Sequence, residues 1–383
     1  MSRSTTLWRT AALLAASGIA LAACGTTGGD DDATGGDDGG GGDCVATVAF
    51  LGPTTGDAAN LGTNIVNGAK LALEEYEGDC EVTLTEFDSQ GDPTQATPLA
   101  TEIINDDSVI GVLGPTFSGE SDATGPAFAE AGLVTVSGSA TNPDITSNGW
   151  ETFHRIIGTD AAQAPADAAL LTGELGATKV FVIDDASEYG AGLAAGVADG
   201  LGDAVAGTET IQQGDRDFNT VVTRVVDSGA DAVFFGGYYQ EAGLLVNQLR
   251  SGGFDGPFVA GDGVLDPGFL ESAGGASADN SFLTCPCGPP TAEFAEAYEA
   301  LSGQAPGTYS PEGYDVMNMF LAGLDEGNTD RAAMLEFISG YDAEGITKHI
   351  TFDDKGDIAE VTVYSYPVEG GELDLSKGTP IEE

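Results

Sequence analysis

From about residue 45 onward, short apolar and β-branched runs alternate with longer stretches in which apolar residues recur every three or four positions. The first pattern is typical of buried strands and the second of amphipathic helices. Strands are predicted at 45–51, 81–87, 108–113, 133–136, 178–184, 231–235 and 257–260. Helices are predicted at 62–77, 93–106, 118–131, 160–175, 188–202, 217–228 and 239–252. This alternation predicts an α/β fold with parallel sheets covered by helices on both faces.

The alternation pauses near residues 153–158 and begins again at Lys179, which predicts two similar α/β lobes. Two domains are also the expectation for a chain of 383 residues. The last third is predicted to be mostly helical, at 290–302, 312–326 and 330–340, and to end in strands at 348–352 and 358–366.

The first 23 residues follow a different pattern. Arg3 and Arg9 precede an apolar run from Ala11 to Ala23, which is shorter than the roughly 20 residues of a membrane-spanning helix and is typical of an export signal peptide. The run ends in Leu21-Ala22-Ala23-Cys24-Gly25, which resembles the bacterial lipobox. The resemblance implies cleavage before Cys24 and attachment of lipid to its thiol. The alternative is an ordinary signal peptide followed by a chance cysteine.

Residues 25–43 hold nine Gly and six Asp and no large apolar residue. Such a segment buries too little surface to offset the entropy of ordering it. Together with Cys24 it is predicted to form a lipidated, disordered tether (24–43) with a span of roughly 25 Å. Its Asp runs lack the spacing of a calcium-binding loop. We therefore expect the folded part to be held at the outer face of the cell membrane.

Composition narrows the class of partner. The chain has 12 basic and 62 acidic residues and a net charge of −50, and removal of the signal peptide takes away two of the arginines. Binding of nucleic acid through counterion release is excluded, as is attraction to anionic lipid headgroups. High acidity keeps a protein soluble and is screened by salt, so a saline habitat or an acidic proteome would each explain it.

Four cysteines follow Cys24. Cys44 and Cys80 each precede a predicted strand, with one helix between the two strands, so a parallel βαβ unit would place the two residues side by side and favour a disulfide. Cys285 and Cys287 are separated only by Pro286. They are expected to form a structural disulfide with each other; metal binding and redox chemistry are the alternatives, but the chain has few further ligands for a metal.

Candidate binding residues follow the predicted strands, where open α/β sheets bind ligands. The segments are Gly114–Ser118, Ser137–Pro143, Asp184–Gly190, Gly236–Tyr238 and Gly261–Gly263. Their hydroxyls and helix-start amides suit a carboxylate, an acid suits an ammonium, and aromatic rings provide an apolar wall. This set predicts a pocket for a zwitterion with an apolar tail.

A series of short segments, in their order along the chain, resembles the leucine/isoleucine/valine-binding proteins of ABC transporters, a type I periplasmic binding fold. The resemblance extends from about Val45 to Tyr366. The segments that carry it are Gly52-Pro53-Thr54-Thr55-Gly56, Gly62, Gly68-Ala69, Asp88, Asp92-Pro93, Ala140-Thr141-Asn142-Pro143, Tyr189-Gly190, Asp217-Phe218, Gly236-Gly237-Tyr238 and Asp353-Asp354-Lys355-Gly356-Asp357.

The resemblance implies two doubly wound parallel-sheet lobes joined by a three-strand hinge. The lobes are expected at 44–159 plus 288–349 and at 160–287 plus 350–383. It also implies roles by position: carboxylate binding by Ser118 and Thr141, a carbonyl from Ser139 for the ammonium with Ala140 beside it, and an ammonium-pairing acid at Asp262. Tyr189, Tyr238, Phe117 and Tyr309 are expected to line the remainder of the pocket.

Two positions depart from the family pattern. Asp262 stands where the family often has glutamate, and Leu61 stands near a position that is often aromatic. Both changes leave the identity of the ligand's side chain open. Asp353–Asp357 is expected to form a turn between the last strands.

The resemblance implies a monomeric solute-binding lipoprotein that delivers a branched-chain or other neutral amino acid to ABC permease subunits. The alternatives are urea, a short amide or an aromatic acid as the solute, or a sensor for a membrane signalling partner. Catalysis is not expected, because the chain lacks G-x-S-x-G, H-E-x-x-H and P-loop motifs and has only two histidines, His154 and His349. No metal or cofactor is expected.

Overall fold

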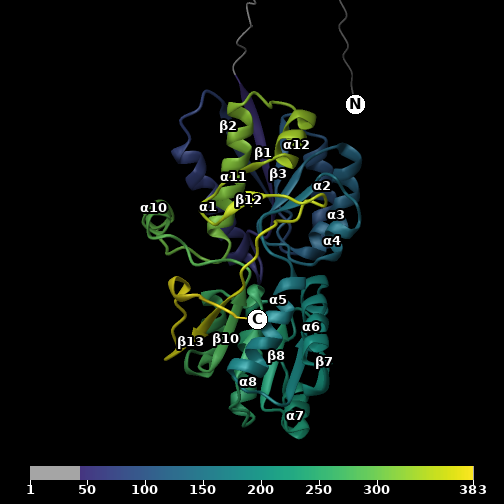
Figure 1. Ribbon diagram of the computed structural model, residues 1–383, viewed down its shortest axis with the longest axis vertical. Helices are drawn as coiled ribbons and strands as arrows, with labels where there is room; N and C mark the ends of the chain where they lie inside the picture. Colours follow the sequence, from purple (N-terminus) through teal and green to yellow (C-terminus); the bar gives the residue numbers. More distant parts are fainter. Residues whose placement is uncertain (1–43, 383) are drawn as a thin grey trace, which may run out of the picture. The chain divides into compact units, whose positions relative to one another are not determined.

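The computed structural model describes residues 44–382. The predicted signal peptide, the lipidation at Cys24 and the tether lie outside these residues. Parallel sheets flanked by helices confirm the predicted α/β class (Figure 1). Within residues 44–382, no helix combines the length and the apolar composition needed to cross a membrane.

The first sheet is parallel throughout and has the strand order β2-β1-β3-β4-β5. Its strands are β1 (Val45–Gly52), β2 (Glu81–Asp88), β3 (Val109–Leu113), β4 (Thr135–Ser137) and β5 (Phe153–Arg155). The helices between them are α1 (Ala59–Glu75), α2 (Pro93–Ile104), α3 (Ser118–Ala131) and α4 (Asp144–Ser147). Along β1, Val48 and Phe50 belong to one apolar core, and Ala49 and Leu51 belong to another. Burial on both faces explains why this strand is an unbroken apolar run.

The second sheet has the order β14-β13-β10-β9-β8-β6-β7. β13 pairs antiparallel with both of its neighbours, β10 and β14, and all other pairs are parallel. Its strands are β6 (Val180–Asp184), β7 (Val205–Thr210), β8 (Ala232–Gly236), β9 (Phe258–Ala260), β10 (Ser281–Cys285), β13 (Tyr364–Val368) and β14 (Thr379–Pro380). The helices along it are α5 (Asp160–Ala169), α6 (Glu188–Leu201), α7 (Asn219–Ser228), α8 (Tyr239–Ser251) and α9 (Pro267–Ala273).

The last third of the chain returns to the first sheet before it completes the second. It contains α10 (Ala292–Ser302), α11 (Ser310–Asp325), α12 (Arg331–Ser339), β11 (Asp342–Glu344) and β12 (His349–Thr351). Strands β11 and β12 pair only with each other, as a small antiparallel sheet. Helix α11 packs on α1 and α12 packs on β3, whereas β13 pairs with β10 in the second sheet. The chain therefore passes between the two sheets three times.

The three connecting segments meet at Gly158. A Cβ atom built there would lie 2.4 Å from Val361 Cγ1 and 2.9 Å from Pro286 Cβ, and these residues belong to the other two connections. Only a residue without a side chain permits so close an approach. This packing agrees with the expected three-strand hinge, while the lobe boundaries given above stay a prediction.

Three sequence predictions need correction. The α-helix expected at 160–175 ends at Ala169 and continues as a π-helical turn, Leu170–Glu174. The strand expected at 358–366 is β13 at Tyr364–Val368, because residues 358–363 belong to a connection between the sheets, where only Phe352 and Ile358 form an isolated bridge. Strands β5, β7, β10, β11 and β14 were not predicted: β5 and β11 are three residues long, β14 has two, and β7 is a partly exposed edge strand.

Cys44 and Cys80 form a disulfide with an S–S distance of 2.02 Å. Cys44 immediately precedes β1 and Cys80 immediately precedes β2, and these neighbouring strands pair from Val45 and Glu81 onward. The bridge therefore joins the starts of two parallel strands, in the geometry expected of a βαβ unit.

Candidate ligand-binding cavity

A cavity lies where segments of the two sheets meet. Its lining residues are Phe117, Ser118, Ser139, Tyr189, Tyr238, Asp262, Gly263 and Tyr309. Apart from Tyr309, which precedes α11, those from the first sheet follow β3 and β4, and those from the second follow β6, β8 and β9. The cavity therefore lies beyond the carboxyl ends of strands. The structure thus brings together seven of the nine predicted ligand residues. The free space is about 10 Å³, which is enough for about one water molecule.

We call Phe117, Ser118 and Ser139 the hydroxyl side of the cavity. Ser118 is the first residue of α3, and its Oγ accepts a hydrogen bond from Asn142 N at 3.2 Å. Ser139 Oγ donates to Thr116 O at 2.6 Å. The positive end of the α3 dipole and its first N–H groups favour an anion here.

Ser118 is the first residue inside α3 and not its cap. The capping position belongs to Phe117, whose N–H donates to Glu120 Oε2 at 2.8 Å. Burial raises the pKa of Glu120 to about 7. Because the glutamate meets the need of the helix start, the Ser118 side chain is not required for capping.

We call Tyr189, Tyr238, Asp262, Gly263 and Tyr309 the acid side. Asp262 is 1 % exposed and begins the short 3₁₀ turn after β9. Tyr189 Oη donates to Asp262 Oδ1 at 2.8 Å, and Tyr309 Oη donates to Oδ2. Burial raises the pKa of Asp262 above its ordinary value, and the two tyrosine hydrogen bonds oppose that rise. A buried acid held in this way is suited to pair with a cation.

Aromatic rings fill the space between the two sides. The ring centroids of Phe117 and Tyr238 are 4.6 Å apart, and those of Tyr189 and Tyr238 are 5.5 Å apart. Tyr238 therefore contacts a ring of the hydroxyl side as well as one of its own side. Tilted aromatic pairs of this kind provide a rigid apolar wall.

The other two predicted residues, Ala140 and Thr141, lie behind the lining of the cavity. Both are buried. Thr141 O accepts from Asp160 N at 2.9 Å, whereas no partner within residues 44–382 lies within hydrogen-bond geometry of Thr141 Oγ1. Leu61, one of the positions that depart from the family pattern, is buried in the apolar core and does not line the cavity.

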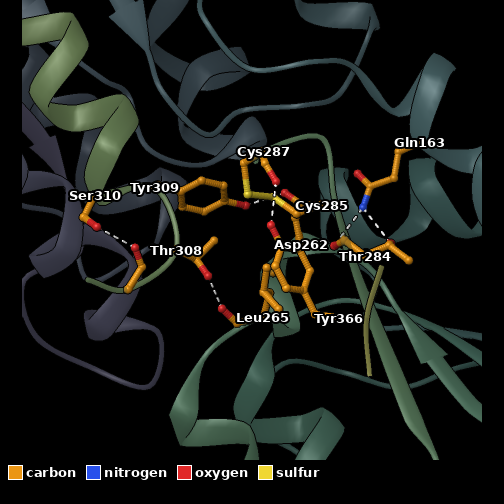
Figure 2. The surroundings of a disulfide bond; sticks show 12 residues. Gln163, Asp262, Leu265, Thr284, Cys285, Cys287, Thr308, Tyr309, Ser310 and Tyr366 are labelled. Carbon is orange, nitrogen blue, oxygen red and sulfur yellow. Dashed lines mark hydrogen bonds between the residues drawn. A yellow bond between two sulfur atoms is a disulfide. The ribbon is translucent and has the colours of Figure 1, made fainter. Parts of the chain in front are cut away.

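A group of buried polar residues on α5 was missed by sequence reasoning. Asp160, Gln163 and Asp167 are all buried. Burial, reinforced by the charge of Asp262, raises the pKa of Asp160 to about 8, and burial raises that of Asp167 well above its ordinary value. Gln163 Nε2 donates to Thr284 O at 3.3 Å and to Thr284 Oγ1 at 3.1 Å (Figure 2). Asp160, Gln163 and Asp167 are spaced i, i+3, i+7 and so lie on one face of α5. This spacing is the sequence signal that could have identified the group.

The second disulfide lies next to the acid side. Cys285 ends β10, and its bond to Cys287 is drawn in Figure 2 beside Asp262 and Tyr309. Tyr366 Oη donates to Cys287 O at 2.9 Å. Cys285 and Cys287 are thus paired with each other, as the sequence predicted. In the described part of the chain, no three His, Cys, Asp or Glu side chains are grouped so that they could hold a metal ion.

Comparison with known sequences places these features in a family. A family model described as periplasmic binding protein matches residues 45–372. The leucine-, isoleucine-, valine-, threonine- and alanine-binding protein of Pseudomonas aeruginosa is 29 % identical over 334 residues, covering 83 % of this chain and 89 % of its own. The Leu/Ile/Val-binding protein of Escherichia coli is 26 % identical and covers 85 % of this chain and 92 % of its own.

Solved structures of amino acid-binding proteins share the fold of this chain. The substrate-binding protein LivJ of a Streptococcus pneumoniae branched-chain amino acid transporter, in complex with isoleucine, superimposes with a TM-score of 0.82 at 26 % identity, covering 88 % of this chain and 99 % of its own. The leucine-binding protein LivK of Thermotoga maritima gives a TM-score of 0.79 at 27 % identity, covering 86 % and 97 %. The fold is that of type I periplasmic binding proteins, and the chain belongs to the periplasmic binding protein family.

Proposed function

We propose that this protein binds a neutral, preferably branched-chain, α-amino acid between its two sheets and delivers it to the permease of an ABC importer. One observation carries the proposal: a single cavity holds the buried acid Asp262 on one side and the start of α3 with Ser118 on the other. An α-amino acid carries an ammonium and a carboxylate on one carbon, so it matches this pair of opposite preferences.

Each part of the ligand has a partner in this proposal. The ammonium pairs with Asp262, which would otherwise be costly to ionise at 1 % exposure. The carboxylate accepts hydrogen bonds from Ser118 and the first N–H groups of α3, with Thr141 Oγ1 close behind. The aliphatic side chain packs on the rings of Phe117 and Tyr238.

Contacts that join the two sides outside the cavity support a clamp mechanism. Asn60 Nδ2 donates to Asp266 Oδ1 at 2.8 Å, and Asn142 Nδ2 donates to Glu188 O at 2.9 Å. An amino acid exceeds the free space of about 10 Å³, so admitting it requires the two sides to separate. A ligand that then contacts both sides stabilises the closed arrangement, to the extent that it prefers that state.

The relatives favour an amino acid over the other solutes considered. The Escherichia relative is named for leucine, isoleucine and valine, the Pseudomonas relative for these three together with threonine and alanine, and the Streptococcus structure holds isoleucine. Urea, a short amide and an aromatic acid all lack the ammonium and would leave Asp262 without a cationic partner.

Binding rather than catalysis fits the lining of the cavity, which contains no His, Lys or Cys side chain. His154 is buried elsewhere, and burial lowers its pKa to about 4. His349 is on β12, where its two ring nitrogens contact Glu344 and Asp342. Neither histidine is placed to act on a ligand in the cavity.

We further propose that the protein functions outside the cytoplasm as a monomer held to the membrane by lipid on Cys24. Labelling of the cells with an alkyne fatty acid tests the anchor. Label is expected in the mature wild-type protein and absent from Cys24→Ser, whereas labelling of that variant would contradict the assignment.

The ligand is tested by isothermal titration and thermal shift of the purified protein with leucine, isoleucine, valine, alanine, urea and benzoate. A ligand that binds only the folded state raises the unfolding temperature. We expect the largest rise with the branched-chain amino acids. A response to urea or benzoate without a response to any amino acid would overturn the proposal.

A further inference from the structure

We infer that Arg155 is a positioning residue that fixes the loop behind the carboxylate site, residues 139–142, in its binding orientation. The inference rests on the proposed function, because it assigns that loop a role in holding the ligand carboxylate. Arg155 does not line the cavity and is 0 % exposed. It therefore acts through the loop and not by contact with the ligand.

The guanidinium of Arg155 bonds to the loop from behind. Nη1 donates to Ala140 O and to Asn142 O, both at 2.8 Å. Between these two carbonyls, Thr141 O accepts from Asp160 N at 2.9 Å. Three successive carbonyl groups of the loop thus accept hydrogen bonds from Arg155 or from the start of α5.

The other face of the same loop is fixed by hydroxyls. Ala140 N donates to Ser137 Oγ at 3.0 Å, and Asn142 N donates to Ser118 Oγ at 3.2 Å. Ser118 is also the residue proposed to bind the carboxylate. Since the carbonyls and the flanking N–H groups are all engaged, rotation of the Thr141 peptide would break several bonds at once.

Arginine is specifically suited to this task. One planar group serves two loop carbonyls through Nη1, Thr146 Oγ1 through Nη2 at 3.0 Å, and Asp357 Oδ1 through Nε at 2.5 Å. Lysine has a single ammonium on a flexible stem and cannot reproduce this fork. The ion pair with Asp357 compensates the burial of the charge, which is costly without a partner.

Asp357 extends the arrangement to the connections between the sheets. It lies in the turn Asp353–Asp357, within the third connecting segment, and Arg155 ends β5 just before the first. Arg155 N donates to Gly356 O at 2.9 Å. Gly356 has φ +87°, and a Cβ atom there would lie 2.3 Å from Phe153 O, so the turn packs directly on β5. The carboxylate loop and two of the three connections therefore share one arginine.

The test compares L-leucine with L-leucinamide, which keeps the ammonium and the side chain but lacks the carboxylate. Their dissociation constants are measured by competition titration for the wild type and for Arg155→Lys. We expect the preference for leucine over leucinamide to fall at least tenfold in Arg155→Lys, while the affinity for leucinamide changes less than threefold. An equal loss for both ligands, or no loss, would overturn the inference.

Arg331→Lys is the matched control. Arg331 also bonds to backbone carbonyls, Val109 O at 2.8 Å and Asp106 O at 2.7 Å, but at the start of β3 and away from the cavity. Its replacement is expected to lower the unfolding temperature and to leave the ligand preference unchanged. A comparable loss of preference in this variant would show that general loosening, and not the Arg155 loop, sets the ratio.

Asp357→Asn covers the case in which Arg155→Lys does not fold. It keeps the arginine but removes the charge that holds its Nε, and we expect a fall of about threefold in the leucine preference. An unchanged preference in folded Asp357→Asn would overturn the inference. If the wild type itself binds no amino acid, the proposed function fails first, which is a different result from a wild type that binds and variants that bind equally well.

Discussion

The hydroxyl side and the acid side of the cavity are held in different ways. On the hydroxyl side, Ser118 and Ser139 bond to backbone groups of neighbouring loops. On the acid side, Asp262 is held by the hydroxyls of Tyr189 and Tyr309, so the functional groups orient one another. The first arrangement is a property of the backbone, and the second is a small network of side chains.

This difference predicts that substitutions on the two sides lower ligand affinity to different extents. Loss of one hydroxyl removes a single contact and leaves the helix start in place. Loss of the acid removes the only charged group of the lining and leaves two buried tyrosine hydroxyls without their acceptor. Buried networks that are only partly satisfied cost more than their pairwise contacts suggest. Loss of the acid is therefore expected to lower ligand affinity more than loss of one hydroxyl.

The largest effect is expected from Asp262→Ala. Removing one partner of a buried ion pair costs about 2–5 kcal/mol, so leucine affinity should fall by about 30-fold or more. Isothermal titration measures this loss. The control ligand is 4-methylpentanoate, which lacks the ammonium and should not bind more weakly to the variant. A leucine affinity within threefold of wild type would remove Asp262 from the ammonium site.

A smaller effect is expected from Ser118→Ala on the opposite side. A hydrogen bond to a charged group contributes about 1.5–3 kcal/mol, and the N–H groups of α3 remain, so leucine affinity should fall about tenfold. Thr291→Ala is the matched control, since Thr291 accepts from Phe294 N at 3.2 Å as the cap of α10. That variant should lose unfolding temperature and keep its affinity. If Ser118→Ala instead lowered the unfolding temperature and kept the affinity for leucine, Ser118 would have a structural role and not a binding role.

A third variant, Tyr309→Phe, tests the network on the acid side. The Tyr309 hydroxyl stabilises the ionised form of Asp262, so its loss raises the pKa of Asp262 further. Leucine affinity should fall about threefold at neutral pH, and on acidification it should begin to decline at a higher pH than in the wild type. Titrations from pH 7 to pH 4 measure this. Tyr366→Phe, whose hydroxyl contacts Cys287 O instead, should leave the profile unchanged.

The smallest expected effect concerns the acids buried behind both sides. Burial raises the pKa of Glu120 and Glu312 to about 7, of Asp160 to about 8 and of Asp185 to about 6. Each folded pKa exceeds the unfolded value, so the folded state binds more protons between about pH 4 and pH 8 and stability declines as pH rises through this range. Calorimetry should show an unfolding temperature several degrees lower at pH 8 than at pH 5.

Asp160→Asn should make the difference in unfolding temperature between pH 5 and pH 8 smaller, because it removes one of the titrating groups. Added salt should raise the unfolding temperature at pH 8, since it screens the repulsion among the excess acids. An unfolding temperature that increases from pH 5 to pH 8 would show that these acids are ionised in the folded protein.

Most of the fold was predictable because its strands are buried on both faces. The run from Val45 to Gly52 is apolar at nearly every position, since each face meets a different helix layer. The edge strand β7 carries Gly207 and exposed polar residues and gives no comparable pattern. β13 was displaced because the apolar residues before it cover a connection between the sheets and not a sheet face.

The lining of the cavity was predictable where position after a strand and residue type agreed, as for Ser118, Tyr189, Tyr238 and Asp262. Arg155 and Asp160 were missed because charged residues are rarely fully buried, and sequence gives no account of the partners that make their burial possible.

The Cys44–Cys80 bridge determines how the folded part responds to a pull at its first described residue. A force applied at Cys44 passes through the sulfur atoms to Cys80 and so loads β1 and β2 together. Peeling β1 away from its neighbours would require the covalent bond to break or both strands to move as one. Tension applied at Cys44 is therefore shared by the starts of β1 and β2, at the end of these strands opposite to the cavity.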